Sequence, residues 1–351
     1  MPSEKHTTPS ITLATPNTED INNINVGGRR NKPPWGSLNR SKVIDIAGIV
    51  LPILAFAVAS RVYSNELLLT YMMVYVVMAQ GVNISYGFTG YLPFGYFGFF
   101  GAGAYAGSIA ILNLHLPALV GVFMGGVGGM VFGSLLLPLF RLRGAYFAIG
   151  TLAAGLALAD VISNPSLVAL TNGPYGINLA SVYSPGPIYV SAEVVMGIAL
   201  VVVYILRHSL FGLSLRAIKD DENSAEMAGV NVVKMRSIAW LLASGLAGMA
   251  GAVFGWATTL FYPSAVFDAN ISVLAIVFAI FGGTESLWGP TLGTILLYSV
   301  YAAIGISNPQ YFQLIYGLVV ILLILFAPKG LVGLVNRKRR PTTIGESHVN
   351  S

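Results

Sequence analysis

Long apolar runs, separated by short polar stretches, decide what this 351-residue chain can fold into. A helix needs about 20 mostly apolar residues to cross the hydrocarbon core of a bilayer. Such runs predict an all-α polytopic membrane protein with about ten transmembrane helices, although eight would also fit. The predicted spans are 43–61, 67–86, 91–112, 117–140, 145–163, 188–206, 237–258, 270–286, 289–306 and 311–327.

Charged residues are scarce and clustered. They make up 9% of the chain, whereas an ordinary soluble domain carries about 25%. Most of them lie in three segments, 1–42, 207–236 and 329–351. The remaining sequence can therefore lie in lipid. Asp45, Asp160 and the few other acidic residues within or beside predicted spans lie near span ends, so we expect them at the membrane interface.

The positions of the basic residues predict which loops are cytoplasmic, because Lys and Arg favour that side. The tail 1–42 is rich in Ser, Thr, Asn and Pro and ends in basic residues, so it is predicted to be disordered and cytoplasmic. The tail 329–351 is basic and is predicted to lie on the same side. Between them, 43–328 forms the predicted permease domain, with a cytoplasmic loop at 207–236 and an external loop at 164–187.

Several classes of function lack support in the sequence. The chain has no cysteine and no histidine pair at HxxxH spacing, so no metal site is predicted. No lysine is followed by Ser or Thr, which rules out a GxxxxGK[ST] phosphate loop, and GAGAYAG (101–107) follows no strand. We expect no catalytic residue and no bound cofactor. If ATP drives this protein, partner subunits must bind and hydrolyse it.

The segment 81–107 is too rich in glycine for a regular helix and also contains a proline. We expect a discontinuous helix here. Non-helical backbone at membrane depth persists only where protein or a watery cavity satisfies its polar groups. The segment is therefore a candidate wall of a translocation path; a tightly packed re-entrant turn is the alternative. The candidate path residues are Asn83, Tyr86, Gly90, Pro93, Gly101 and Gly103.

Two other spans carry glycines at four-residue spacing. Such faces let helix backbones approach closely in lipid, where no hydrophobic force drives helix association. We therefore interpret these glycines as helix-packing positions rather than ligand contacts. They are Gly121, Gly125, Gly129 and Gly133 in one span and Gly251 and Gly255 in another.

The segment 207–236 is long for a connection between two spans and mixes charged with apolar residues. This pattern predicts one or two short amphipathic helices, with Gly229 as a helix C-terminal residue. Such helices either lie on the membrane surface or insert into a groove of a partner protein.

Five stretches of the sequence resemble branched-chain amino-acid ABC permeases of the LivM type, and the likeness covers about 43–335. They are SAEMAGVNVVKMRSIAWLLASGLAGMAGAVFGW (224–256), GYLPFGYFGFFGAGAYAG (90–107), RLRGAYFAIGTLA (141–153), FGGTESLWGPTLG (281–293) and TNGPYGI (171–177). Met227, Glu285 and Ser286 depart from the family pattern, because smaller residues are commoner at those positions.

The resemblance implies a loop that docks on an ATPase, with Arg216, Glu226, Ala228 and Gly229 as coupling residues. It implies a bacterial inner-membrane importer subunit for branched-chain or other neutral amino acids. The implied partners are a second homologous permease, two ATP-binding cassette subunits, a binding protein outside and membrane lipid. No nucleic-acid partner is expected, since the net charge of +5 is concentrated at the chain ends. A urea or short-chain amide permease, or a secondary transporter, is the alternative.

Overall fold

The computed structural model describes residues 35–63, 65–307, 317–318 and 321, of which 35–42 and 306–307 are described by their backbone alone. Residues 1–42 and 43–351 form two separate units, and the second contains the helix bundle. The tails 1–34 and 329–351 and most of the predicted span 311–327 lie outside the described residues. Helix α2 (Trp35–Val62) begins within the range that the sequence assigns to the N-terminal tail.

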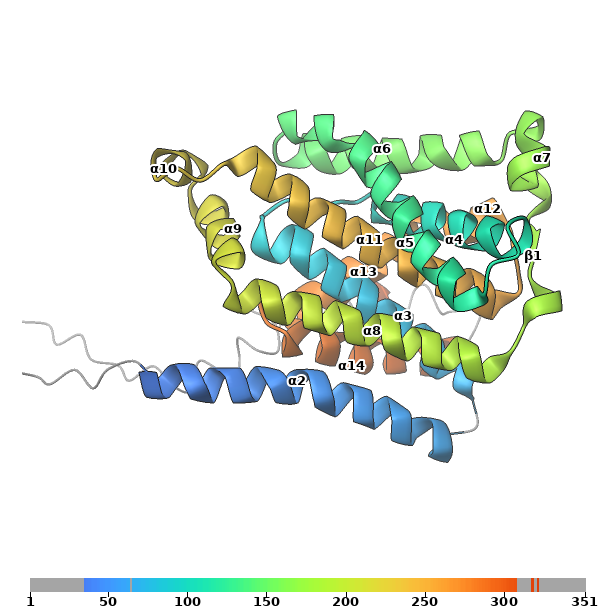
Figure 1. Ribbon diagram of the computed structural model, residues 1–351, viewed down its shortest axis with the longest axis horizontal. Coiled ribbons are helices and arrows are strands. Elements are labelled where there is room, and N and C mark those ends of the chain that lie inside the picture. Colours follow the sequence, from blue (N-terminus) through green and yellow to red (C-terminus); the bar gives the residue numbers. More distant parts are fainter. Residues whose placement is uncertain (1–34, 64, 308–316, 319–320, 322–351) are drawn as a thin grey trace, which may run out of the picture. The chain divides into compact units, whose positions relative to one another are not determined.

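The described chain is almost entirely helical (Figure 1). The long helices after α2 are α3 (Glu66–Val82), α4 (Tyr96–Leu112), α5 (Ala118–Leu135), α6 (Ala145–Ile162), α8 (Pro185–His208), α11 (Val232–Thr258), α13 (Ala269–Gly282) and α14 (Trp288–Ser307). The shorter ones are η1 (Asn83–Phe88), η2 (Leu137–Arg141), η3 (Pro165–Leu167), α7 (Val168–Thr171), η4 (Gly173–Tyr175), η5 (Ala180–Val182), α9 (Leu210–Asp220), α10 (Glu222–Met227) and α12 (Pro263–Val266). Two short strands, β1 (Ile177–Asn178) and β2 (Leu260–Phe261), pair antiparallel.

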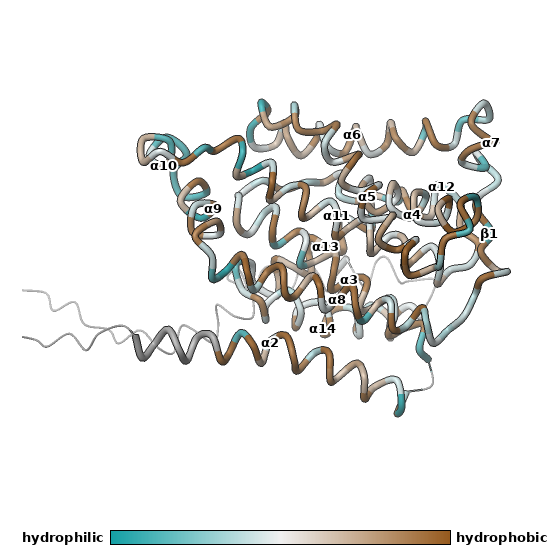
Figure 2. Tube along the Cα trace, in the orientation of Figure 1, coloured by the Kyte–Doolittle hydropathy of each residue, from teal (hydrophilic) through white to brown (hydrophobic). Residues whose placement is uncertain are grey.

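Seven helices in the described part of the chain are long and apolar enough to cross a membrane, and α4 is a shorter apolar helix. Figure 2 shows apolar residues along these helices, while hydrophilic residues concentrate in α9, α10 and the connecting turns. The predicted all-α polytopic membrane fold is confirmed. The number of ten spans and the cytoplasmic side of both termini stay predictions.

Polar caps explain where several of these helices begin. A side-chain oxygen accepts a hydrogen bond from a backbone amide of the first turn, which would otherwise have no partner. Asn65 caps α3, Ser209 caps α9, Asp221 caps α10, Asn231 caps α11 and Asp268 caps α13. The chain therefore specifies these boundaries locally, independently of its apolar pattern.

Two helices end earlier than hydropathy alone predicts. The predicted span 117–140 stops as an α-helix at Leu135 and continues as the 3-10 turn η2. Pro138 lies in that turn, and proline cannot donate the hydrogen bond that an α-helix would require. The predicted span 270–286 ends at Gly282, because Gly283 adopts a positive φ of 103° that ends the helix.

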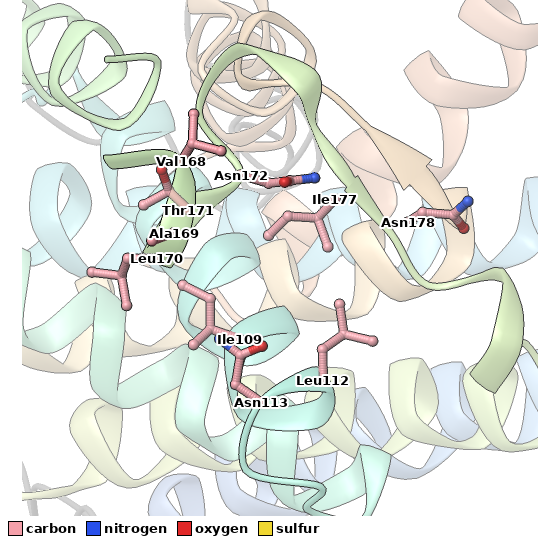
Figure 3. A pocket seen from close by; sticks show the side chains of 10 residues that line it. All are labelled: Ile109, Leu112, Asn113, Val168, Ala169, Leu170, Thr171, Asn172, Ile177 and Asn178. Carbon is pink, nitrogen blue, oxygen red and sulfur yellow. The ribbon is translucent and has the colours of Figure 1, made fainter. Parts of the chain in front are cut away.

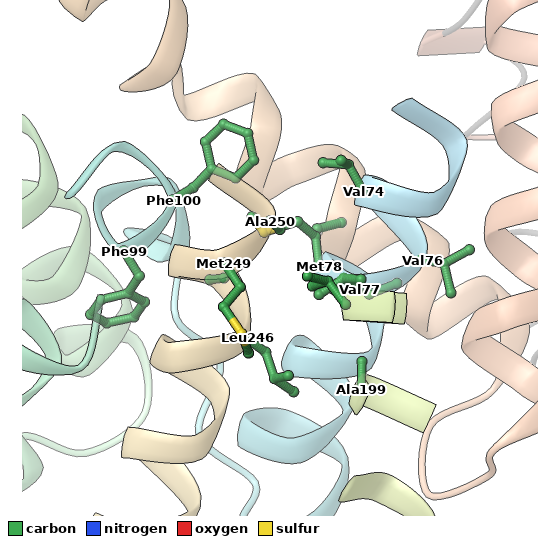
Figure 4. Packing of buried hydrophobic residues seen from close by; sticks show 14 of the residues in the cluster. Val74, Val76, Val77, Met78, Phe99, Phe100, Ala199, Leu246, Met249 and Ala250 are labelled. Atoms are coloured by element: carbon green, nitrogen blue, oxygen red, sulfur yellow. The ribbon is translucent and has the colours of Figure 1, made fainter. Parts of the chain in front are cut away.

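The core of the bundle lies around α11 and α3, whose spans are largely buried, whereas α2 and α6 expose most of theirs. Figure 4 shows side chains of α3, α4, α8 and α11 packed against one another, among them Val77, Phe100 and Leu246. Helices α4, α5 and α11 pack on each other, and α13 packs on α14 and α3. The exposed apolar side chains of α2 and α6 suit contact with lipid or with another membrane subunit.

Glycines let α4, α5 and α11 approach one another closely. A β-carbon added at Gly129 would lie 3.0 Å from the Cα of Gly248, and one at Gly125 would lie 2.9 Å from the Gly248 carbonyl oxygen. Gly103 of α4 also meets the backbone of Gly248. Gly248 is thus the shared contact of three helices, which the four-residue spacing of Gly251 and Gly255 does not reveal.

The remaining predicted packing glycines also lie in close contacts, three with another helix and one with strand β2. A β-carbon on Gly121 would meet the Ile111 side chain, and one on Gly133 would meet Ser244. Gly251 lies against the backbone of Phe100, and Gly255 lies against the ring of Phe261. All six therefore occupy positions where a larger side chain would need other atoms to move.

Candidate coupling and translocation site

Helix α3 changes to a π-helix, η1, over Asn83–Phe88, and regular helix resumes only at Tyr96. The structure thus contains the helix break that the sequence predicts within 81–107. Gly90 adopts a φ of +80°, and Pro93 lies in the non-helical stretch. Single-turn π segments inside helices occur frequently at functional sites.

A buried polar network holds this break against the turn between α13 and α14. The side-chain amide of Asn83 donates to the Ser286 carbonyl oxygen at 3.0 Å and to Gln80 Oε1 at 3.1 Å. In return, Asn83 Oδ1 accepts a hydrogen bond from the Glu285 backbone amide at 2.7 Å. Both amide side chains, Asn83 and Gln80, are fully buried.

Gln80 extends the network into α14. Its Nε2 donates to the Leu287 carbonyl oxygen at 2.8 Å and to Thr291 Oγ1 at 2.9 Å. Unsatisfied polar groups are costly inside a membrane protein, so a network with its partners in place favours one arrangement of these helices. The sequence pattern indicates Asn83 but not Gln80, whose partners Leu287 and Thr291 lie more than 200 residues away.

The other predicted path residues fall into two groups. Tyr86 is half-buried in η1, and Gly90 lines a cavity of about 220 Å³ with Tyr91. Gly101 and Gly103 instead lie in close contacts, the first with the ring of Phe267 and the second with Gly248. The structure therefore brings Asn83, Tyr86, Gly90 and Pro93 together at the break and places the two later glycines in helix packing.

The segment 207–236 contains the last two residues of α8, all of α9 and α10, and the first turn of α11. Helix α9 buries Leu215 and Ile218, and Ile218 packs with Ala225 and Val232 in a small cluster of its own. The segment therefore has its own apolar core. Figure 1 shows α9 and α10 at the end of the bundle opposite to α7 and β1.

Helix α10 ends in a Schellman motif centred on Gly229. The Gly229 amide donates to the Glu226 carbonyl oxygen at 2.9 Å, and the Val230 amide donates to the Ala225 carbonyl oxygen at 3.0 Å. Gly229 has a φ of +84° and open space around it, so only its backbone conformation requires glycine. Glu226 and Ala228 are exposed on the same turn.

The start of α10 is fixed by Asp221. Its carboxylate accepts hydrogen bonds from the Asn223 amide, at 3.1 Å, and from the Ser224 hydroxyl. The hydrogen bond from Ser224 is the main reason why the pKa of the Asp221 carboxyl lies below its usual range. This cap therefore persists as the pH falls until the carboxylate itself takes up a proton.

Arg216, the fourth predicted coupling residue, points back into this chain. Its guanidinium donates to the carbonyl oxygens of Arg207, at 3.2 Å, and Gly212, at 3.3 Å. It thereby satisfies carbonyl groups at the turn between α8 and α9. Arg216 thus forms its hydrogen bonds within this chain, whereas Glu226 is exposed.

Asp45 is buried, although the sequence places it at a span end. Its side chain is 2% exposed, and its two oxygens lie 3.1 Å from Arg207 Nη1 and 3.0 Å from His208 Nε2. This cluster joins α2 to the end of α8. Asp45 is more than 160 residues from these partners in the sequence. The one signal in the sequence that such a cluster exists is the high cost of an unpaired carboxylate near the membrane.

At the opposite end of the bundle, a cavity of about 300 Å³ lies between the end of α4 and the segment 168–178. Figure 3 shows Ile109, Thr171 and Asn172 among its lining residues. The β1–β2 pair closes one side, with Ile177 opposite Phe261. Trp256 Nε1 donates to the Val182 carbonyl oxygen at 3.0 Å and attaches this region to α11.

Comparisons with known proteins agree with this architecture. Residues 65–324 match the family described as Branched-chain amino acid transport system / permease component. The chain is 27% identical over 337 residues to the high-affinity branched-chain amino acid transport system permease protein LivM of Escherichia coli (strain K12), covering 85% of this chain and 76% of that protein. No solved structure gives a significant match.

Two other relatives differ in the substrates that their names give. The probable branched-chain amino acid transport permease protein LivH of Methanocaldococcus jannaschii is 25% identical over 295 residues, which is 78% of this chain and 90% of that protein. The fructose import permease protein FrcC of Rhizobium meliloti is 31% identical over 126 residues, 34% of this chain and 35% of that protein.

The family match covers most of the chain, from α3 to beyond α14, and includes both the helix break and the α9–α10 segment. The apolar helices and the permease relatives together make this a multi-pass inner-membrane protein. The chain belongs to the family of branched-chain amino acid ABC transporter permeases.

Proposed function

We propose that this permease is one membrane subunit of an importer that carries branched-chain or other neutral amino acids and is driven by separate ATPase subunits. A second homologous permease would complete the pathway, and a soluble binding protein would deliver the substrate from outside. The family and the 27% identity to LivM over 85% of the chain support the substrate class.

The observation that carries the coupling role is the exposed turn at the end of α10. Glu226 and Ala228 are exposed, and the Met227 side chain is 83% exposed, while Gly229 supplies the positive φ that shapes the turn. An apolar side chain this exposed beside a carboxylate suits a partner surface with an apolar groove and a basic rim. We assign this surface to the ATPase and the α9–α10 end to the cytoplasm.

The break at η1 supports a role in the translocation path. Helix α3 packs on α8, α11, α13 and α14, so a change in its position would reach most of the bundle. Alternating access requires that substrate and ATPase each bind one of two arrangements more tightly. The proposed moving element is the stretch from Asn83 to Pro93, in which regular helix is interrupted.

Reconstitution in proteoliposomes tests this function. This chain alone should neither hydrolyse ATP nor accumulate leucine. With the second permease, the ATPases and the binding protein, leucine uptake should depend on ATP and survive collapse of the proton gradient. Leucine uptake by this chain alone that follows the gradient would contradict the proposal in favour of a secondary transporter. ATP-dependent uptake of fructose or urea in place of every neutral amino acid tested would contradict the substrate class.

A further inference from the structure

Lys219 connects the α9 helix to the helix break. Its Nζ donates a hydrogen bond to the Gly87 carbonyl oxygen at 2.9 Å, near the end of η1. The same ammonium group forms an ion pair with the carboxylate of Glu285, in the turn between α13 and α14. One side chain of α9 therefore contacts two separate elements that meet at the break.

The backbone of Glu285 is in a conformation that glutamate rarely adopts, with a φ of +69°. Its side chain is 44% exposed and that of Lys219 is 27% exposed. Ion pairs this accessible to water contribute little to stability. Glu285 therefore has an unfavourable backbone conformation, and its carboxylate forms an ion pair that adds little stability. This combination points to a role other than holding the fold together.

Hydrogen bonds continue from Glu285 into the middle of the bundle. The Glu285 amide donates to Asn83 Oδ1, Asn83 donates to Gln80, and Gln80 donates to Thr291 of α14. Each bond joins groups that are buried or partly buried. A continuous polar connection therefore runs from α9, through the turn, to the interior of α3 and α14.

A second cation holds the other side of the same break. Arg236, in α11, forms a two-point ion pair with Glu222 of α10, at 2.7 and 3.2 Å. Its guanidinium also lies over the ring of Tyr91, 4.5 Å from the ring centre. Lys219 thus contacts Gly87, and Arg236 contacts Tyr91, four residues further along the chain. The two cations hold both ends of the stretch in which η1 ends.

We propose that Lys219 and Glu285 are positioning residues that make the break move together with α9 and α10. The inference rests on the proposed function, since it says how movement of the ATPase-bound segment reaches the translocation path. Lys219 acts through its hydrogen bond to the Gly87 carbonyl oxygen on η1. Glu285 binds Lys219 with its carboxylate and Asn83 with its backbone amide. Neither residue needs to touch the transported substrate.

Two variants remove the connection in different ways. Glu285→Gly removes the carboxylate and also relieves the positive-φ backbone, so a carboxylate with no role in either coupling or stability predicts equal or greater thermal stability and unchanged transport. Lys219→Met removes the ammonium group and keeps an unbranched side chain. Lys219→Arg retains a cationic donor, and Lys234→Met removes an exposed lysine from the first turn of α11.

The measurement is leucine uptake, ATP hydrolysis and melting temperature of the complete reconstituted assembly. For Glu285→Gly and Lys219→Met we expect retained ATPase subunits, continued ATP hydrolysis and about a tenfold fall in leucine carried per ATP, a typical size for coupling between two sites. Lys219→Arg should recover most of that ratio, and Lys234→Met should match the parent protein.

Other outcomes overturn the inference. An unchanged ratio in both variants, with ATP-driven uptake by the parent assembly, contradicts it and leaves the proposed function standing. Loss of the ATPase subunits or a lower melting temperature in Glu285→Gly would make the pair structural. Failure of the parent assembly to carry any neutral amino acid with ATP would contradict the proposed function, and this inference with it.

Discussion

Gly125 of α5 and Gly248 of α11 meet so closely that a β-carbon on Gly125 would lie 2.9 Å from the Gly248 carbonyl oxygen. The reverse substitution meets more backbone, since a β-carbon on Gly248 would lie 3.0 Å from the Cα of Gly129 and closer still to Gly125. Helices that depend on small residues for contact in lipid have no other way to pack at this distance.

Replacing Gly248 with valine should therefore force α4, α5 and α11 apart. Overpacking of this kind costs about 2 kcal/mol or more. We expect a lower melting temperature in detergent and a lower yield of folded protein. Gly186→Ala is the matched control, because a β-carbon there has open space. A melting temperature of Gly248→Val equal to that of the control would show that this contact is not required for packing.

The buried Asp45 cluster predicts a second effect on stability. Asp45→Ala leaves Arg207 and His208 without the carboxylate that binds both. Loss of a hydrogen-bonded charged group of this kind costs about 1–3 kcal/mol. The free energy of unfolding or the melting temperature should fall accordingly. Asp160→Ala removes an exposed aspartate from α6 and should change neither quantity; equal effects of both substitutions would contradict the cluster's role.

Local signals in the sequence predicted some features well. Hydropathy predicted the long helices, glycine and Pro93 predicted the break near Gly90, and the position of Gly229 predicted the end of α10. Each signal acts within a few residues of the feature it predicts, because propensity, capping and positive φ are properties of the local backbone. The roles of the predicted coupling residues and path residues stay predictions.

Contacts between distant parts of the chain could not be predicted in the same way. Lys219 and Glu285 are 66 residues apart, and nothing near either residue indicates the other. Gly248 was missed for a different reason. Helical faces repeat every 3.6 residues, so a glycine three positions before Gly251 lies on the same face although the four-residue spacing omits it.

The Schellman turn allows a test of the docking surface that leaves the interior untouched. Gly229→Val places a β-branched residue at a positive φ, which costs about 1–2 kcal/mol, whereas Gly229→Asn tolerates that conformation. We expect co-purification of the ATPase and leucine uptake to fall for valine and to persist for asparagine. Glu226→Lys should reduce both through its reversed charge. Normal association in the valine and lysine variants would remove this turn from the docking surface.

Cysteine labelling tests on which side of the membrane the two ends of the bundle lie. The parent chain contains no cysteine, so any introduced thiol is the only one. Tyr175, whose side chain is 70% exposed, lies in the segment 164–187, and Asn223 is exposed in α10. Tyr175→Cys should react with an impermeant thiol reagent in intact cells, and Asn223→Cys only after permeabilisation. Because an ATPase needs cytoplasmic ATP, reaction of Asn223→Cys in intact cells would place the α10 surface on the wrong side for the proposed coupling.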